Sequence, residues 1–193
     1  MSTGLKLPTY ADIEALPEGM TGEILAGELV VSPRPAARHA RSGNVLAHCL
    51  GGPFDIDDDG PGGWWILSEP ELHLDADALY PVVVPDLAGW HRHRLDSLED
   101  IVAFTVVPDW ICEILSPSTA LRDRKQKLPF YGRAGVRHVW LVDPTLRTLE
   151  VFRFETGAWR VVSIFSGDDR VRAEPFDAVE LALGKLWPPP PAA

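Results

Sequence analysis

The sequence predicts an α/β (α+β) domain in which a mixed β-sheet is flanked by helices. Short apolar stretches typical of strands follow one another along most of the chain. Two longer stretches with helical spacing interrupt them in an order that does not match a regular doubly wound fold. With 193 residues, 46% of them hydrophobic, the chain can bury one core. We therefore expect a single domain over residues 1–187 and a disordered Pro-rich tail at 188–193.

The N-terminal part is expected to form a short helix over residues 9–16 and then a β-hairpin. The stretch "GEILAGELVVSP" predicts the hairpin, because Ala26 and Gly27 separate two apolar runs. A longer helix is expected over residues 36–50, where apolar side chains recur at helical spacing. This helix should cover one face of a sheet.

The rest of the chain is expected to be mainly strands, with a second helix over residues 117–133. Ser116 is the predicted N-cap of this helix, and Pro117 stands at its first position. The strands are predicted at residues 64–74, 82–90, 110–115, 138–142, 148–154 and 159–165. The last three are close enough in sequence to form a meander.

The net charge, the cysteines and the lack of long apolar runs limit what the protein can bind and where we expect it to be located. The net charge of −10 means that the average surface repels phosphate, so any binding of nucleic acid must depend on a local basic patch. Cys49 and Cys112 are far apart and form no CxxC pair, which argues against a disulfide framework or a zinc site. No charged leader precedes an apolar run, and no run approaches the roughly 20 residues that span a bilayer. We expect a cytoplasmic protein without a membrane segment.

Two conspicuous motifs are interpreted as structural. "DIDDDG" at residues 55–60 opens like a calcium loop, but Ile66 stands at the twelfth position, where a bidentate glutamate is needed. A solvated acidic turn is the favoured interpretation. "HRHR" at residues 91–94 could contact phosphate or a metal, but a polar loop after a strand often contains such a run.

A glutamate lies inside the apolar strand "DWICEIL". Alternation of side chains places Asp109 and Glu113 on the same side of this strand. A buried carboxylate without a partner is costly, so Glu113 needs either a salt bridge, which is the more common case, or a hard divalent cation. Asp86, which follows "VVVP", could present a second carboxylate at the same edge, or could be an ordinary turn residue.

The segment after Glu113 is the most basic part of the chain. Asp123, Lys127 and Tyr131 recur at four-residue spacing, so they should share one face of the second helix. A pair of carboxylates that hold a metal, together with a nearby lysine, meets the needs of phosphodiester hydrolysis. The basic side chains around this face are Arg122, Arg124, Lys125, Arg133 and Arg137.

Five stretches resemble, in order, the Uma-type restriction endonuclease family of the PD-(D/E)XK nuclease superfamily. They are "GEILAGELVVSP", "VVPDLAGW", "EILSPST", "RDRKQKLPFYGRAGV" and "HVWLVDP". The resemblance covers roughly residues 21–154. It implies a restriction-endonuclease-like mixed sheet flanked by helices, and a metal-dependent endonuclease that acts on DNA with Mg²⁺ (or Mn²⁺).

By position, the resemblance implies that Asp86 and Glu113 are metal ligands, together with the carbonyl of Ile114. It also implies that Lys127 is the catalytic lysine, supplied from the helix, because Leu115 stands where the simple superfamily motif has its lysine. The accessory candidates are Glu28, His39, Lys125 and Asp109. The candidate contacts to nucleic acid are Arg38, Arg41, Arg122, Arg124 and Arg133.

Pro129 and Asp109 leave alternatives to this assignment open, whereas Asp143 is expected to be structural. An interior proline costs a helix about 3 kcal/mol, and if Pro129 re-aims Lys127, then Lys125 would be the functional lysine or the site would be idle. Asp109 competes with Asp86 as the partner of Glu113, but it lies about 13 Å away along the same strand. Asp143 in "LVDP" is expected only to cap a turn.

Three functions remain open. The favoured one is a magnesium-dependent DNA endonuclease. The second is a catalytically idle nucleic-acid-binding or mobile-element accessory protein with the same fold. The third is a structural or protein-partner module in which Glu113 is merely paired with Lys127. A homodimer is a further expectation, because two-fold symmetry would place two sites on the two strands of a duplex.

Overall fold

The computed structural model describes residues 7–74 and 80–189. The predicted N-terminal helix is α1 (Tyr10–Glu14), and the predicted hairpin is formed by β1 (Thr21–Leu25) and β2 (Glu28–Ser32). Ala26 (φ 53°) and Gly27 (φ 78°) are both left-handed, as a two-residue type I′ turn requires. The hairpin joins two short strands, β4 (Leu72–His73) and β5 (Val82–Val83), in a four-stranded sheet of order β2-β1-β5-β4.

The main sheet has six strands in the order β10-β9-β8-β7-β6-β3. Its central strands β7 (Trp110–Ile114) and β8 (His138–Asp143) are parallel, and their outer neighbours pair with them in antiparallel fashion. The predicted meander is therefore present, and the sheet is mixed as expected. The other four strands are β3 (Trp64–Ser68), β6 (Leu87–His91), β9 (Thr148–Glu155) and β10 (Ala158–Ser166).

Two predicted strands are each divided between the two sheets. The chain leaves β3 at Glu69 (φ 50°) and Pro70 before it enters β4, and it passes from β5 to β6 through Pro85. A proline cannot donate to a sheet ladder, so each of these points ends a strand that the apolar pattern alone would continue. The second division places Asp86 directly before β6.

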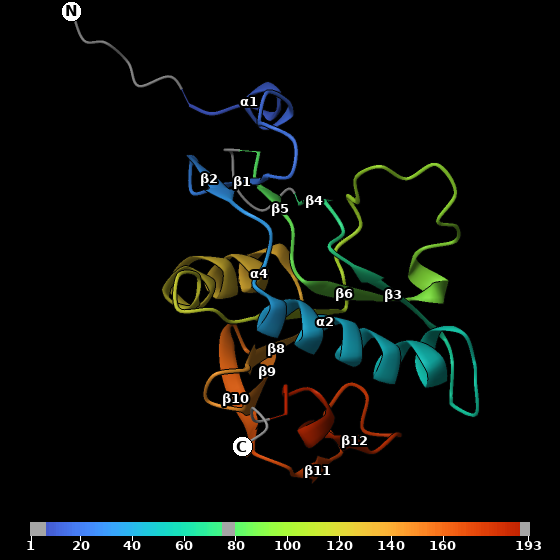
Figure 1. Cartoon of the computed structure of the whole chain (residues 1–193). Helices are drawn as coiled ribbons and strands as arrows, with labels where there is room; N and C mark the ends of the chain where they lie inside the picture. Colours follow the sequence, from blue (N-terminus) through green and yellow to red (C-terminus); the bar gives the residue numbers. More distant parts are fainter. Residues whose placement is uncertain (1–6, 75–79, 190–193) are drawn as a thin grey trace, which may run out of the picture.

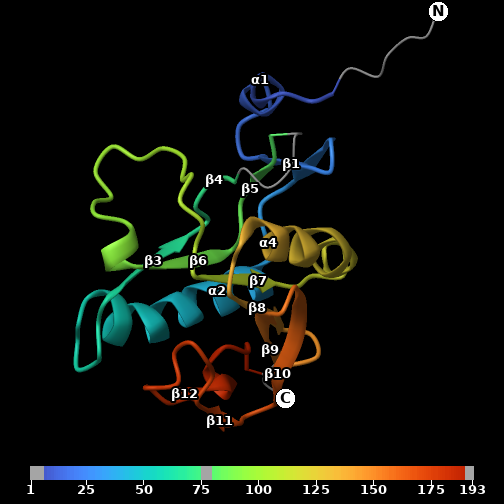
Figure 2. The same cartoon turned by 180° about the vertical axis from the view of Figure 1, so that it is seen from behind.

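Two helices cover opposite faces of the main sheet. The first is α2 (Ala37–Leu50), and the second is a continuous helix built from α3 (Ala120–Arg122), a π-helical turn (Asp123–Lys127) and α4 (Leu128–Ala134). Cys112 of β7 packs with Leu46 of α2, whereas Ile111 packs with Tyr131 of α4. In Figure 1, α2 lies in front of the main sheet. In Figure 2, which shows the molecule from behind, α4 lies in front of it.

The second helix begins later than predicted. Residues 117–119 form a turn in which Ser116 and Thr119 each bond the other's backbone N–H through a hydroxyl oxygen, at 3.3 and 3.2 Å. Pro129 was expected to kink or break the helix, but it does not break it. The preceding turn is widened, with Leu128 N donating to Asp123 O five residues back, and the helix continues through the proline. Lys127 therefore stays on the face that it shares with Asp123 and Tyr131, and all three are buried.

The C-terminal part packs against the α2 face of the sheet through Phe176, whose ring lies 4.9 Å from Trp110 and 5.7 Å from Trp140. It contains a two-stranded sheet of β11 (Arg170–Val171) and β12 (Leu181–Ala182) and a 3₁₀ turn (Leu183–Lys185). Of the predicted tail, residues 190–193 lie outside the described residues. No helix in the described ranges has the length and apolar character needed to cross a bilayer.

The two conspicuous motifs bind each other. Arg92, in a 3₁₀ turn (Arg92–Arg94), donates to the carbonyl of Asp55 and lies 3.7 Å from the Asp57 carboxylate. Asp55 also accepts a 3.2 Å hydrogen bond from Ile66 N, so its carboxylate ties the acidic turn to β3. Asp143 accepts hydrogen bonds from the backbone of the two residues after Pro144, at 2.8 and 2.9 Å, and so has the predicted capping role.

Candidate active site

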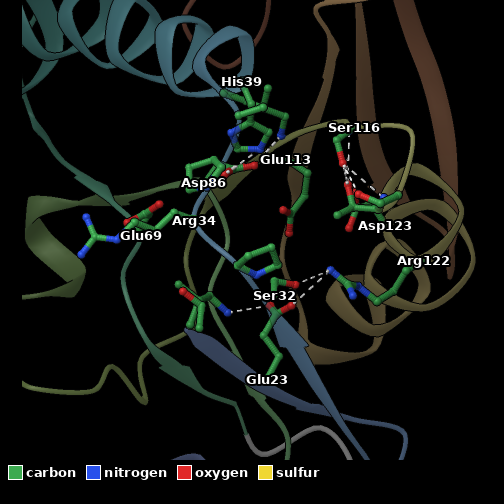
Figure 3. A pocket seen from close by; sticks show the side chains of 18 of the residues that line it. Glu23, Ser32, Arg34, His39, Glu69, Asp86, Glu113, Ser116, Arg122 and Asp123 are labelled. Atoms are coloured by element: carbon green, nitrogen blue, oxygen red, sulfur yellow. Dashed lines mark hydrogen bonds and ion pairs between the residues drawn. The ribbon is translucent and has the colours of Figure 1, made fainter. Parts of the chain in front are cut away.

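A cavity of about 370 Å³ opens between the N-terminal hairpin, the beginning of α2 and the second helix (Figure 3). The carboxyl end of β7 forms its floor. The charged side chains that line it are the carboxylates Glu23, Glu69, Asp86, Glu113 and Asp123, the cations Arg34, Arg122 and Lys127, and His39. Carboxylates outnumber the fixed cations, so the cavity suits a bound cation even before any substrate enters.

Asp86 and Glu113 meet at the junction of β6 and β7. The two strands pair with Leu87 opposite Cys112, so one further step of this antiparallel register brings Asp86 opposite Glu113. Asp86 Oδ2 accepts a 2.6 Å hydrogen bond from the N–H of Ile114, which anchors this carboxylate to β7. The structure thus brings together the two residues predicted as metal ligands.

Lys127 lies deep in the cavity, with only 2% of its surface exposed. Its Nζ is 2.7 Å from Glu113 Oε1 and 2.9 Å from Glu23 Oε1. The buried hydroxyl of Tyr131, one helical turn further on, donates to the same oxygen of Glu113. The four-residue spacing noted in the sequence therefore directs Lys127 and Tyr131 to one carboxylate.

Glu23, in β1, is a member of the site that was not predicted. It is 6% exposed, and besides Lys127 its Oε1 accepts a 2.9 Å hydrogen bond from Val84 N. A glutamate within the apolar run "GEIL" is the same signal that singled out Glu113, so the sequence did contain an indication of Glu23. Glu28, the hairpin glutamate that was predicted instead, is exposed at the start of β2 and does not line the cavity.

Burial and charge determine the protonation of this cluster. Burial acts to lower the pKa of Lys127, but the charges of Glu113, Glu23 and Asp123 outweigh it and raise that pKa. Lys127 therefore remains an ammonium ion. Burial raises the pKa of Glu113 from 4.5 to about 8, against the opposing attraction of Lys127. The pKa of Asp123 is raised for the same first reason.

His39, in the first turn of α2, contacts both parts of the predicted ligand set. Its Nε2 lies 3.2 Å from Asp86 Oδ1, and the ring also forms a hydrogen bond with the backbone of Ile114. Burial acts to lower the pKa of His39, but these contacts with Asp86 and Ile114 raise it overall. His39 therefore lies beside the candidate ligands, and its accessory role stays a prediction.

Two other accessory candidates lie away from the cavity. Asp109, at the opposite end of β7, accepts a 2.6 Å hydrogen bond from Arg94 and a 3.0 Å bond from His91 N. Alternation along the strand was predicted correctly, but Asp109 is one strand length away from the site. Lys125 is exposed and does not line the cavity, because positions two residues apart on a helix differ by roughly 200° in direction, so Lys125 faces away from the side of Lys127.

The predicted arginines fall into two groups. Arg122 lines the cavity, where its guanidinium lies 3.8 Å from Glu23 and 3.5 Å from Ser32 Oγ. Arg124 instead forms a two-pronged contact with Glu150 of β9 and does not line the cavity. The other three are exposed on their helices: Arg38, Arg41 and Arg133.

The donor set of the cavity fits a hard cation such as Mg²⁺. Within residues 7–74 and 80–189, no three His, Cys, Asp or Glu side chains come close enough to form a ligand set by themselves. Mg²⁺ does not need such a set, because it commonly binds one or two carboxylates and retains several waters. Asp86, Glu113 and the carbonyl of Ile114 would supply three oxygens of this kind.

Comparison with known proteins agrees with this geometry. A family described as "Uma2: Putative restriction endonuclease" matches residues 7–184. The chain belongs to this family. The resemblance found in the sequence is thereby confirmed, and the match to Uma2 includes the residues that line the cavity.

A solved structure is similar to this Uma2 protein over nearly its whole length. It is the crystal structure of "a putative nuclease belonging to DUF820" from Anabaena variabilis, with a TM-score of 0.72 and 20% sequence identity. The match covers 93% of this chain and 97% of that chain. At this identity the similarity shows the fold, and it confirms the predicted fold class. No curated protein matches the chain.

Proposed function

We propose that this Uma2 protein is a metal-dependent endonuclease that hydrolyses phosphodiester bonds in DNA. The observation that carries the proposal is the convergence of Asp86, Glu113 and Lys127 on one open cavity. Asp86, Glu113 and the Ile114 carbonyl would hold Mg²⁺ or Mn²⁺. When bound, such an ion polarises the phosphate and supplies an activated water.

The protein's own side chains have distinct tasks in this proposal. Lys127 stays protonated between Glu113 and Glu23, so it acts as a fixed positive charge that stabilises the developing negative charge on the phosphate, rather than as a base. Tyr131 fixes the orientation of Glu113 through its hydroxyl. Arg122, on the cavity wall, is placed to bind a phosphate oxygen of the DNA backbone.

The proposal is tested by nicking of a supercoiled plasmid in the presence of Mg²⁺ or Mn²⁺. Glu113→Ala removes a ligand and is expected to abolish metal-dependent nicking, while the thermal unfolding midpoint shows that the variant is folded. The control Glu18→Gln alters an exposed carboxylate that does not line the cavity, so its rate should equal that of the wild type.

Other outcomes have defined meanings. Equal nicking rates for wild type and Glu113→Ala would contradict the proposal. If the wild type neither nicks DNA nor binds Mn²⁺ in calorimetry at millimolar concentration, the idle nucleic-acid-binding alternative is favoured. In that case the contact between Lys127 and Glu113 is only a buried ion pair.

A further inference from the structure

We infer that Glu23 is a positioning residue of the active site, which holds Lys127 from the N-terminal hairpin and leaves Glu113 able to bind the metal. This inference rests on the proposed nuclease function and adds a residue to its machinery. Glu23 does not need to touch the substrate, because it acts through Lys127.

The contacts of Glu23 join three separate segments of the chain. Its carboxylate extends from β1, and its Oε1 is 2.9 Å from both Lys127 Nζ and Val84 N. Val84 lies two residues before Asp86, and Lys127 belongs to the second helix. A single buried oxygen therefore ties the hairpin both to the segment that delivers a metal ligand and to the helix that delivers the lysine.

The second part of the inference follows from the crowding at Glu113. Lys127 Nζ and the Tyr131 hydroxyl both contact Oε1 of Glu113, the carboxylate proposed to hold the metal. If Lys127 had no second carboxylate, its whole charge would act on Glu113 and compete with the cation. Glu23 shares this charge, at nearly the same distance as Glu113.

The net charge of the buried cluster also indicates that Glu23 favours binding of the metal. Glu23, Lys127 and Glu113 together carry one net negative charge when all three are ionised, and replacing Glu23 by glutamine removes it. A divalent cation at Asp86 and Glu113 would then lose the attraction of one nearby charge in a partly buried site. We expect Mn²⁺ to bind roughly tenfold more weakly as a result.

The first experiment measures catalysis in the full-length chain. Glu23→Gln preserves shape and an oxygen acceptor for Val84 N, so the variant should fold. We expect its single-turnover nicking rate to fall by roughly 10- to 100-fold, because a displaced charge in the active site has effects of this size. The dissociation constant for DNA should stay within about twofold, since Glu23 is only 6% exposed and does not need to touch the substrate. Glu18→Gln makes the same change in charge at an exposed site and should leave both values unchanged.

A double-variant comparison separates positioning from a purely structural role. Lys127→Met should lower the nicking rate more than Glu23→Gln. If Glu23 acts through Lys127, adding Glu23→Gln to Lys127→Met should cause no further loss. An equal fractional loss in both backgrounds would overturn the inference, and so would an unchanged rate in Glu23→Gln alone.

Calorimetry with Mn²⁺ provides a readout that does not require catalysis. Glu23→Gln should weaken Mn²⁺ binding more in the wild-type background than in Lys127→Met, because in the second background only the loss of its own charge remains. Equal weakening in both backgrounds would overturn the inference. If the wild type binds Mn²⁺ yet cleaves no DNA, the proposed function fails while this comparison still decides the role of Glu23. If the wild type binds no Mn²⁺, both the proposed function and this inference are overturned.

Discussion

A single ammonium group, Lys127 Nζ, lies between carboxylates from two different sheets, Glu23 of β1 and Glu113 of β7. Asp123 adds a third charge from the same helix. Burial is the main reason why Glu113 keeps its proton to unusually high pH, and Lys127, as one cation among three buried carboxylates, offsets this effect only in part. The same imbalance is what a divalent cation would relieve.

The raised pKa of Glu113 predicts how stability depends on pH. The native protein holds this proton up to about pH 8, whereas the unfolded chain releases it near the ordinary pKa of 4.5. The stabilising contribution is thus complete below the unfolded pKa and is lost as the pH rises through the folded one, by at most about 1.4 kcal/mol per pH unit. Urea unfolding across this range should show a decline that is shallower in Glu113→Gln. The same decline in both proteins would contradict the prediction.

The second helix links the position of Lys127 to packing against the main sheet. Its widened turn at Asp123–Lys127 accommodates Pro129. Its last turn approaches β9 and β10 so closely that a Cβ at position 132 would lie less than 3.0 Å from the side chains of Phe154 and Trp159. Trp159 Nε1, from β10, donates a 2.7 Å hydrogen bond to Leu128 O in the same helix. The position of Lys127 therefore depends on how this helix rests on the sheet.

Gly132→Ala tests the packing of this helix. The added Cβ would lie 2.6 Å from Phe154 Cε2 and 2.9 Å from Trp159 Nε1, so the helix or both rings must move. Overpacking of this kind typically costs about 1–3 kcal/mol, which urea unfolding would detect. Gly51→Ala is the matched control, because nothing lies within 4 Å of its added Cβ and its φ of −59° is helical. Equal stability of the two variants would show that the helix packs more loosely than described.

The whole molecule carries a net charge of −10, so binding of DNA has to depend on a local arrangement of cations. Arg122 lies in the cavity wall with long contacts to Glu23 and Ser32, whereas Arg124 forms a short ion pair with Glu150. The adjacent basic residues predicted together as DNA contacts thus differ in their availability.

Salt dependence should separate these two arginines. With a Glu113→Ala background to prevent cleavage, Arg122→Ala should weaken DNA binding and reduce the salt slope of log K by roughly 1. Arg124→Ala should leave the slope unchanged but lower the free energy of unfolding by up to about 1 kcal/mol, because it breaks a half-exposed ion pair. Anisotropy titrations over a range of KCl concentrations measure the slope. If both variants reduced the salt slope of log K by the same amount, Arg124 would contact DNA in spite of its ion pair with Glu150, and the prediction would be wrong.

Much of the fold was predictable because it follows from local patterns. The hairpin turn at Ala26 and Gly27, the alternation along β7 and the meander β8-β9-β10 all appear where the sequence placed them. The errors in the strands occurred where proline divided an apolar run between two sheets, since hydrophobicity does not indicate which sheet a strand joins. The single domain and the homodimer stay predictions.

The sequence by itself determined the mixed sheet and the family, and the resemblance to that family implied the candidate trio of Asp86, Glu113 and Lys127, because motif order and short-range patterns do not depend on the fold. Only the tertiary structure decided that Glu23, and not Glu28, reaches the lysine, and that Asp109 and Lys125 stay outside the cavity. Both glutamates follow a glycine in similar apolar runs, so local pattern treats them alike. What distinguishes them is the docking of the hairpin against a helix about one hundred residues away in sequence, and such long-range packing is set by the whole core rather than by any neighbouring residue.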